Sequence, residues 1–276
     1  MNNTEKLKEI LEGLYQKYNT AEFISSDPVM FVHRYSERED MEIAAFIASS
    51  LAYGRVAQVK KSVDDLLSRM GKSPREFIDS FDRNQAAKLS GFKHRFNTGK
   101  DFVMLFNAFK ELLDEFGSLE NAFNRCTEKN DPDVIPALTK FTHLLKERAG
   151  GHKTRGLGYL LANPGSNSPC KRLNMFLRWT VRNDSVDPGP WEKIGAEKLI
   201  IPLDTHLIRL CRIIGLHKSK NPTMQTAKEV TEKFALICPE DPVKYDFALS
   251  RIGIVENCNG RGCVYCGTCE LRGFCG

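Results

Sequence analysis

Long apolar runs are missing from this 276-residue sequence. No stretch approaches the ~20 consecutive apolar residues that a membrane-spanning helix needs, and no signal-peptide pattern opens the chain. We therefore expect a soluble, cytoplasmic protein. A strong excess of one charge is also missing, because 40 Lys and Arg residues oppose 35 Asp and Glu residues and leave a net charge of +5. So mild a basic excess is compatible with a nucleic-acid partner but is not evidence for one.

Strand-like alternation of apolar and polar residues is scarce, and no internal repeat or low-complexity segment is visible. Apolar residues recur instead at helical spacing through most of the chain, so we predict an all-α protein. A chain of this length can bury its core in one large domain or in two small ones. The helices that the spacing predicts cover about residues 4–18, 36–52, 56–70, 74–81, 101–116, 132–148, 170–179 and 205–214.

Two kinds of local pattern stand out within this helical reading. The second half of the 36–52 segment is apolar on nearly all sides, which is typical of a helix in the centre of a core. Lys93-His94-Arg95-Phe96 is basic and aromatic, and residues 149–154 are basic and rich in glycine. We predict that both are solvated loops.

Cysteine is concentrated at the end of the chain, where five of the nine cysteines lie between Cys258 and Cys275. A segment this short cannot bury a core of its own, so something else must hold it together. Bound metal is the first candidate, since thiolates bind metal strongly and the binding energy becomes folding energy. Disulfides are the alternative, and the missing secretory signal argues against them. The remaining thiols lack ligand spacing, and we predict that they are buried: Cys126, Cys170, Cys211 and Cys238.

The cysteine spacing leaves the first metal ligand open. Cys266, Cys269 and Cys275 are separated by two and five residues, and the fourth ligand is either Cys258 or Cys263. Soft thiolates select iron–sulfur clusters or zinc. The repeated two-residue gap that begins at Cys263 also suits a zinc site.

Two helix starts elsewhere carry polar residues of interest. The turn formers of residues 163–169 lead into a helix that opens with Lys171. Free backbone N–H groups at such a helix start suit phosphate binding, although most such loops are only loops. Asp204 follows Pro202 and is placed to cap the next helix, which by itself is an ordinary structural role.

Three landmarks together resemble one protein family. Leu203-Asp204-Thr205-His206-Leu207-Ile208-Arg209 resembles the V-D-T-H-x-x-R segment of the helix-hairpin-helix DNA glycosylases, and Lys171-Arg172-Leu173-Asn174 resembles their K-x-A-N. The spacing from Cys258 to Cys275 is similar, with one extra residue, to the C-x6-C-x2-C-x5-C loop of the endonuclease III and MutY glycosylases. The landmarks occur in the family's order, and the resemblance covers about residues 30–276.

The resemblance implies a fold and a cofactor. It implies two all-α lobes: a six-helix lobe over about residues 25–185 that carries the hairpin, and a second lobe formed by residues 1–24 and 186–276. It implies a structural [4Fe–4S] cluster, with zinc as the alternative. The ligands would be Cys258, Cys266, Cys269 and Cys275, with Cys263 as a spare thiol or an alternative ligand.

The resemblance also implies a reaction and its site. Asp204 matches the family's catalytic carboxylate, and Lys171 matches the nucleophilic lysine of members that also cleave the DNA backbone. The partner would be duplex DNA with a base flipped into a cleft, bound by a monomer. The residues expected to contact DNA are Arg172, Arg178, His206, Arg209 and Arg261. Those expected to line a substrate pocket are Tyr53, Arg55, Asp187 and Trp191.

The sequence also departs from the family at specific points. Its hairpin turn, residues 163–169, is longer than the family's L-P-G-V-G and lacks the second glycine. Ser50-Leu51-Ala52 stands where endonuclease III has S-A-Q, so the glutamine that probes DNA is absent. The expected function is a DNA N-glycosylase of DNA repair, with or without lyase activity. The alternatives are a non-catalytic DNA-binding module that keeps the fold and cluster, and an enzyme that acts on a hypermodified base.

Overall fold

The computed structural model describes residues 3–151, 154–166, 168–258 and 262–275. The prediction of a mostly helical protein is confirmed. Within these ranges the named strands are limited to β1 (Lys93–His94) and β2 (Asn97–Thr98), which pair antiparallel. The predicted DNA contact Arg261 lies outside the described residues.

The helices follow one another with short connections. Those of the first part of the chain are α1 (Asn3–Tyr18), α2 (Ala21–Ile24), η1 (Pro28–Arg34), α3 (Arg38–Leu51), α4 (Val56–Met70), α5 (Pro74–Asp79), α6 (Arg83–Lys88), α7 (Gly99–Phe116), α8 (Leu119–Arg125) and α9 (Ile135–Arg148). Those that follow are α10 (Arg155–Leu160), η2 (Pro164–Ser166), α11 (Lys171–Val181), η3 (Ala196–Lys198), α12 (Thr205–Ile213), α13 (Met224–Ala235), α14 (Asp246–Ile254), η4 (Val264–Gly267) and η5 (Glu270–Phe274).

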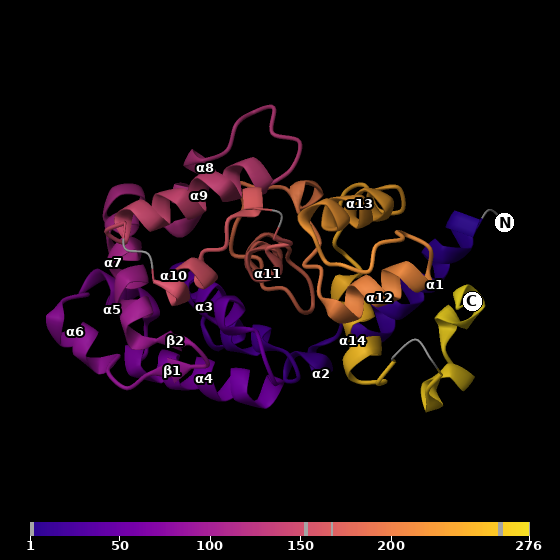
Figure 1. The fold of residues 1–276 in the computed structure, drawn as a ribbon, viewed down its shortest axis with the longest axis horizontal. Coiled ribbons are helices and arrows are strands. Elements are labelled where there is room, and N and C mark those ends of the chain that lie inside the picture. Colours follow the sequence, from indigo (N-terminus) through magenta and orange to yellow (C-terminus); the bar gives the residue numbers. More distant parts are fainter. Residues whose placement is uncertain (1–2, 152–153, 167, 259–261, 276) are drawn as a thin grey trace.

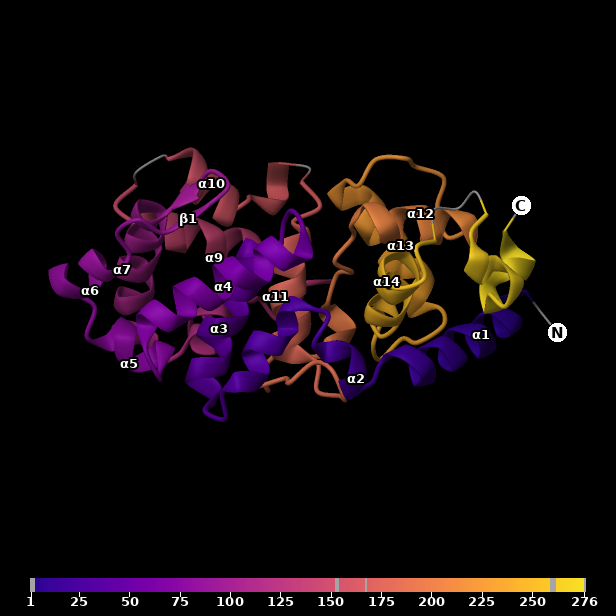
Figure 2. The same cartoon turned by 90° about the horizontal axis from the view of Figure 1, so that it is seen from below.

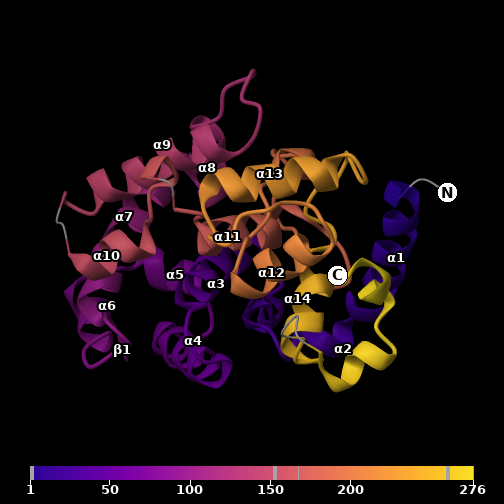
Figure 3. The ribbon, with the colours of Figure 1, turned by 45° about the vertical axis from the view of Figure 1, so that its right-hand side comes forward.

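The helices form two groups along the long axis of the molecule. Figure 1 shows α3 to α10 on the left and α12 to α14 on the right, with α11 between them. Helix α1 lies on the right beside the C-terminal segment, where it packs against α14 and η5. In Figures 1 and 3, α8, α9 and α13 lie along one edge and α4 along the other. The boundaries of the two predicted lobes stay a prediction.

Helix α3 is the central helix of the left-hand group, as its apolar sequence predicts. Every residue from Glu42 to Leu51 is buried. The ring of Phe46 makes edge contacts with Phe109 of α7 at 5.0 Å and with Phe176 of α11 at 5.1 Å between centroids. Because α3 contacts helices on several sides, it has no solvent-exposed face over this range.

Capping residues set several helix starts. Asp27 accepts from the backbone N–H of Val29 ahead of η1, and Ser73 accepts from Glu76 ahead of α5, each followed directly by proline. Such pairs satisfy N–H groups that the helix leaves without partners. The expected start at residue 132 is wrong, since α9 begins at Ile135.

The segment 93–98 corrects a second expectation. It forms a tight hairpin with Arg95 and Phe96 at its tip, rather than a loop without regular structure. The Tyr53 hydroxyl bonds to the Asn97 side chain and lies 3.1 Å from the His94 carbonyl oxygen, so the hairpin is attached to the end of α3. Part of the expected 149–154 loop also has a defined role, because the Thr154 hydroxyl caps α10.

A buried ionic network joins α11 to the right-hand group. Arg178 pairs with Asp187 at 3.0 Å and with Asp246 of α14. Arg182 pairs with Asp187, Asp184 and Asp241. Desolvation is costly here, but each guanidinium contacts two or more carboxylates, which keeps the pKa of both arginines above the usual range.

No helix in the described ranges has both the length and the apolarity needed to cross a membrane.

Candidate functional site

A cavity of about 730 Å³ lies where the two groups of helices meet. Its walls come from the 52–56 loop and α4, from α10, and from the first turns of α11 and α12. The end of α14 closes it with Gly253, Ile254 and Asn257. Six residues that the sequence predicted for the site are brought together here: Tyr53, Arg55, Lys171, Arg172, Asp204 and His206.

Lys171 and Asp204 stand at the starts of two different helices. Lys171 is the first residue of α11 and is half-buried, and no ion pair involves it within the described ranges. Asp204 caps α12 through Oδ1, which accepts from the backbone N–H groups of His206 at 2.9 Å and Leu207 at 2.8 Å. The ordinary capping role is therefore real. It occupies one carboxylate oxygen, while the residue also lines the cavity with Lys171.

His206 is held between α12 and α14. Its Nδ1 lies 3.2 Å from Nη2 of Arg209, and the same Nη2 donates to the carbonyl oxygen of Cys258. A Cβ atom at Gly253 would lie 2.9 Å from the Cβ of His206, so glycine is what lets the two helices approach here. Arg209 is not part of the cavity wall. It ties the histidine to the start of the cysteine-rich tail.

The opposite wall is aromatic and cationic. The guanidinium of Arg172 lies 3.7 Å from the ring centroid of Tyr159 and 5.2 Å from that of Tyr53. Its Nη1 donates to the Ser50 carbonyl oxygen at 2.8 Å, and its Nη2 donates to that of Tyr159. Burial raises the pKa of Tyr53 to about 12, so its hydroxyl stays protonated at neutral pH.

Besides Arg209, three predicted site residues lie elsewhere. Arg178 is 3% exposed and belongs to the buried ionic network, so the expected phosphate contact is wrong. Asp187 is fully buried between Arg178 and Arg182 and does not line the cavity. Trp191 is also buried, where its Nε1 donates to Glu42 at 2.9 Å. Arg178 and Trp191 each have a partner that is distant in sequence, Asp246 and Glu42, and the local pattern gives no sign of this.

Sequence reasoning missed several cavity residues. Tyr159 belongs to a helix of only six residues, between Gly158 and a turn, where apolar periodicity gives little signal. Gly253 and Asn257 lie between the two segments that the family resemblance matched one by one, residues 203–209 and the cysteines from Cys258 onward. Asn257 has a left-handed φ of 53°, a conformation that asparagine adopts more readily than most residues, so its residue type is a local sign in the sequence.

The comparison with protein families gives one match. The model described as protein of unknown function (DUF2400) matches residues 27–255. The chain belongs to this family. No curated protein and no solved structure matches the chain.

The DUF2400 match covers all the cavity residues except Asn257 and ends just before the cysteine-rich tail. In that tail Cys258 is buried, Cys263, Cys266 and Cys269 are half-buried, and Cys275 is exposed. The four cysteines without ligand spacing are all buried, as predicted. Tail residues also pair with α1: Lys17 lies 2.9 Å from Glu270, and the Tyr18 hydroxyl donates to Glu256 at 2.8 Å.

The tail supplies the right kind of donors for the implied metal. The sulfurs of Cys263 and Cys266 are 3.6 Å apart, and the Cys263 backbone N–H donates to the Cys266 sulfur at 3.2 Å. Two thiolates on one tetrahedral zinc, at about 2.3 Å each, would be separated by about 3.8 Å. Within the described ranges, however, no group of three or more Cys, His, Asp or Glu residues has the arrangement of a site for a single metal ion. The donor chemistry therefore fits a thiolate-held group, while the first ligand stays open between Cys258 and Cys263.

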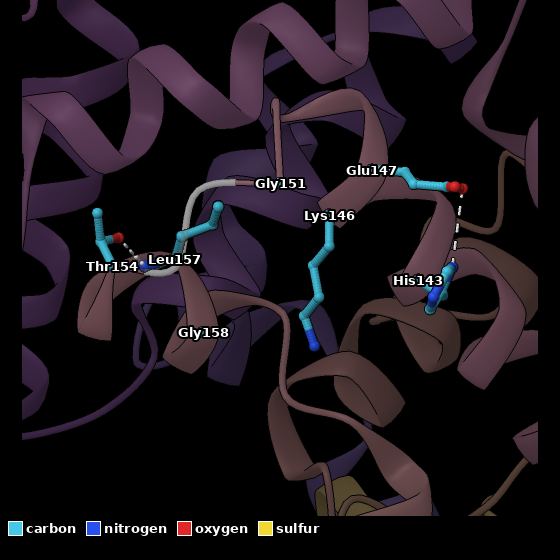
Figure 4. Close-up of a pocket in the computed structure, with 7 residues that line it drawn as sticks. All are labelled: His143, Lys146, Glu147, Gly151, Thr154, Leu157 and Gly158. Atoms are coloured by element: carbon cyan, nitrogen blue, oxygen red, sulfur yellow. Dashed lines mark hydrogen bonds and ion pairs between the residues drawn. The ribbon is translucent and has the colours of Figure 1, made fainter.

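A second cavity of about 540 Å³ lies between α9 and α10. Figure 4 shows the Lys146 side chain extending toward α10, with His143 and Glu147 paired at 3.7 Å on the far side. Burial lowers the pKa of Lys146. This cavity contains none of the residues that the sequence predicted, so the larger cavity is the better candidate.

Proposed function

We propose that this chain is a DNA N-glycosylase that removes a modified base from duplex DNA. The observation that carries the proposal is the placement of Lys171 and Asp204. They lie on different helices, α11 and α12, and line one cavity together with His206 and Tyr53. A carboxylate, an amine and an aromatic wall in one cavity are groups that can together break a glycosidic bond.

The cavity suits a nucleobase in size and in character. Ligand sites for small molecules typically enclose about 300–1,000 Å³, and this one encloses about 730 Å³. A base turned out of the duplex would leave its stack and regain contact with the rings of Tyr53 and Tyr159. The charges of Arg55 and Arg172, which also line the cavity, would face the negative backbone of the DNA.

Each residue has a defined part in the reaction. The C1′–N bond breaks and its electron pair leaves with the base, which takes up a proton. The Asp204 carboxylate stabilises the positive charge that develops on the sugar. The amine of Lys171 bonds to C1′ in place of the base, and its two protons pass to the departing base and, as the C1′–O4′ bond opens, to O4′, which leaves an imine. If water attacks in place of Lys171, the products are the free base and the intact sugar.

The region around Lys171 supports the proposal. Helix α10, the turn that contains η2, and helix α11 follow one another as a helix-hairpin-helix element would. The turn is longer than the usual hairpin, and Cys170 takes a left-handed conformation, with φ of 44°, immediately before Lys171. In the proposed reading this element binds a DNA phosphate with its backbone N–H groups.

The implied cluster has a structural place in the proposal. Cys258, Cys266, Cys269 and Cys275 would hold it, and it would stabilise a tail that has little apolar core of its own. Through Arg209, which donates to the Cys258 carbonyl oxygen, the tail is linked to His206 in the cavity.

The test is a lesion-library screen of the purified full chain for base release, combined with borohydride trapping. We expect one or more lesions to be released and a reduced protein–DNA adduct to form. Lys171→Gln should abolish the adduct. Arg83→Gln, which changes an exposed residue of α6 far from the cavity, should leave both unchanged. Base release by Lys171→Gln at the normal rate, with no adduct in either protein, would show that Lys171 is not the nucleophile.

One observation favours a second candidate, a DNA-binding module without catalysis. Asp204 already accepts two backbone N–H bonds, which a purely structural residue would also do. Binding of DNA without release of any base from the library would support that candidate and contradict the first.

A further inference from the structure

Three aromatic rings and three guanidinium groups gather beside the cavity. The rings of Tyr53, Phe96 and Tyr159 are mutually in contact, with centroids 4.6 to 5.6 Å apart. They come from the end of α3, the hairpin tip and α10, and Figures 1 and 2 show the hairpin beside α10. The guanidinium groups belong to Arg95, Arg155 and Arg172. We call these six residues the arginine–aromatic cluster.

Each guanidinium lies over a ring of the cluster. Arg95 is 5.6 Å from the Tyr53 centroid and Arg155 is 5.1 Å from that of Phe96. Arg172 is 3.7 Å from that of Tyr159. Across the residues that the structure describes, none of these arginines forms an ion pair with a carboxylate. Their charge is therefore available to a ligand.

One carboxylate, Asp101, lies close enough to influence Tyr53, and its oxygens are already used. Oδ2 accepts from the backbone N–H of Thr98 at 2.7 Å and from its hydroxyl at 3.0 Å, and Oδ1 accepts from the Thr154 hydroxyl at 2.6 Å. The cluster keeps a net positive charge because its three guanidinium groups outnumber this one carboxylate.

The hairpin tip is built to present Arg95. This residue has a φ of 55°, a left-handed conformation that glycine or asparagine adopts more easily. The Arg95 side chain passes close to Gly54. A Cβ atom added at Gly54 would lie 3.3 Å from Nη1 of Arg95. The left-handed conformation costs arginine backbone energy, and the contact between its guanidinium and the Tyr53 ring offsets this cost.

We propose that the arginine–aromatic cluster binds an unpaired nucleobase next to the one held in the cavity. The proposal rests on the proposed function and adds a substrate class: DNA with an unpaired stretch beside the target base. Tyr53, Tyr159 and Arg172 belong to the cavity wall, while Phe96, Arg95 and Arg155 extend the same surface beyond it.

The chemistry of the cluster matches this ligand. Every base has a π-face that stacks on aromatic side chains and on guanidinium planes, whatever its sequence. A paired base in a duplex hides that face. The cluster should therefore prefer single-stranded or gapped DNA to a fully paired duplex of the same length.

The experiment compares the affinity of the full chain for two undamaged DNAs by fluorescence anisotropy. One is a 20-base-pair duplex, and the other is the same duplex with a three-nucleotide gap. We expect tighter binding to the gapped DNA. Phe96→Leu and Tyr159→Leu, which keep apolar bulk without the ring, should each weaken gapped-DNA binding by about tenfold. Phe96→Tyr and Tyr159→Phe should retain it.

The salt dependence separates stacking from simple charge. Phe96→Leu should leave the slope of log affinity against log salt unchanged, whereas Arg155→Gln should reduce it by nearly one. Arg83→Gln is the matched arginine control and should change neither the affinity for gapped DNA nor the slope of log affinity against log salt. Thermal unfolding followed by circular dichroism checks that each variant is folded.

Equal affinity for the gapped and paired DNAs, or full gapped-DNA affinity in both leucine variants, would overturn the inference. The two proposals fail separately. A lack of base release in the lesion screen leaves this binding result intact, and an unchanged leucine variant leaves base release intact.

Discussion

Glu42 is a carboxylate held in the core by three N–H donors. The backbone N–H groups of Leu119 and Glu120 donate to it at 2.7 and 3.0 Å, and Nε1 of Trp191 donates at 2.9 Å. It therefore caps α8 from a neighbouring helix. Burial outweighs these donors and raises the pKa of Glu42 to about 7.

This shift predicts a pH dependence of stability. Between pH about 4.5 and 7, Glu42 is protonated in the folded state and ionised in the unfolded state. The corresponding stabilisation is present below this window and is lost as the pH rises through 7, by an amount on the order of 3 kcal/mol. Urea unfolding at several pH values tests it. Compared with Glu42→Gln, which cannot titrate, the wild type should lose free energy of unfolding as the pH rises from about 4.5 to 7. The same pH dependence in both proteins would contradict this prediction.

Two helical glycines form a matched pair for a second prediction. A Cβ at Gly253 would lie 2.9 Å from the His206 side chain, whereas a Cβ at Gly13 would meet nothing within 4 Å. We expect Gly253→Ala to lower the free energy of unfolding by about 1–3 kcal/mol through overpacking. Gly13→Ala should raise it by about 0.5–1 kcal/mol through helix propensity. Chemical denaturation measures both, and stabilisation of both variants would show that the α12–α14 contact is not tight.

At the same scale, the sequence shows which residues have unusual chemistry better than it shows their partners. Motif matches marked Lys171 and Asp204, and both line one cavity with Tyr53. Arg178 was expected to contact DNA and Asp187 to line a substrate pocket, but both are buried in the ionic network. One partner of Arg178, Asp246, lies 68 positions along the chain, and no local pattern reveals a buried ion pair of this kind.

Helix α1, near the N-terminus, packs against elements near the C-terminus. Leu7, Leu11 and Leu14 form its buried stripe, and Lys17 and Tyr18 bond to residues of the last 25 positions. The helix thus covers α14 and η5, as Figure 2 shows. Its periodicity predicted the helix itself but not the surface that it packs against.

The prediction at this scale concerns Leu11→Ala. Removing a fully buried leucine side chain should lower the free energy of unfolding by about 2–5 kcal/mol. Hydrogen exchange should rise first in α1, α14 and residues 270–274. Equal acceleration in α5 and α7 would mean that α1 does not stabilise the C-terminal segment in particular.

Elements with long periodic patterns were predicted well, and several of the short ones were not. Helices α1, α4 and α7 lie close to their expected bounds because each has an apolar stripe of three or more turns. The 93–98 hairpin and α10 span only six residues each, so the bonds of Tyr53 and Asp101 decide their conformation. Such contacts join residues about 40 or more positions apart, and a local window cannot show them.

At the scale of the whole molecule, the tail predicts a metal content. Anaerobically purified protein should be brown and contain about four irons per chain. Cys266→Ser, Cys269→Ser and Cys275→Ser should each lose the iron and weaken DNA binding, while α3 to α9 stay folded by circular dichroism. Colourless protein with one zinc per chain would contradict the cluster.

Two further variants decide whether Cys258 or Cys263 is the first metal ligand. Loss of iron in Cys258→Ser, with Cys263→Ser unaffected, is the result that the implied spacing predicts. The reverse result would assign the ligand to Cys263, whose sulfur lies 3.6 Å from that of Cys266.

The most direct test of the proposed function is the single-turnover rate of base release by Asp204→Asn, on the lesion that the screen identifies. Asparagine caps helices as well as aspartate does, so α12 and the thermal stability should be preserved. The carboxylate charge is lost, and we predict that the rate falls at least about 100-fold while DNA affinity stays within a few-fold of the wild type. An unchanged rate in a folded Asp204→Asn protein would contradict the assignment of this cavity as the catalytic site.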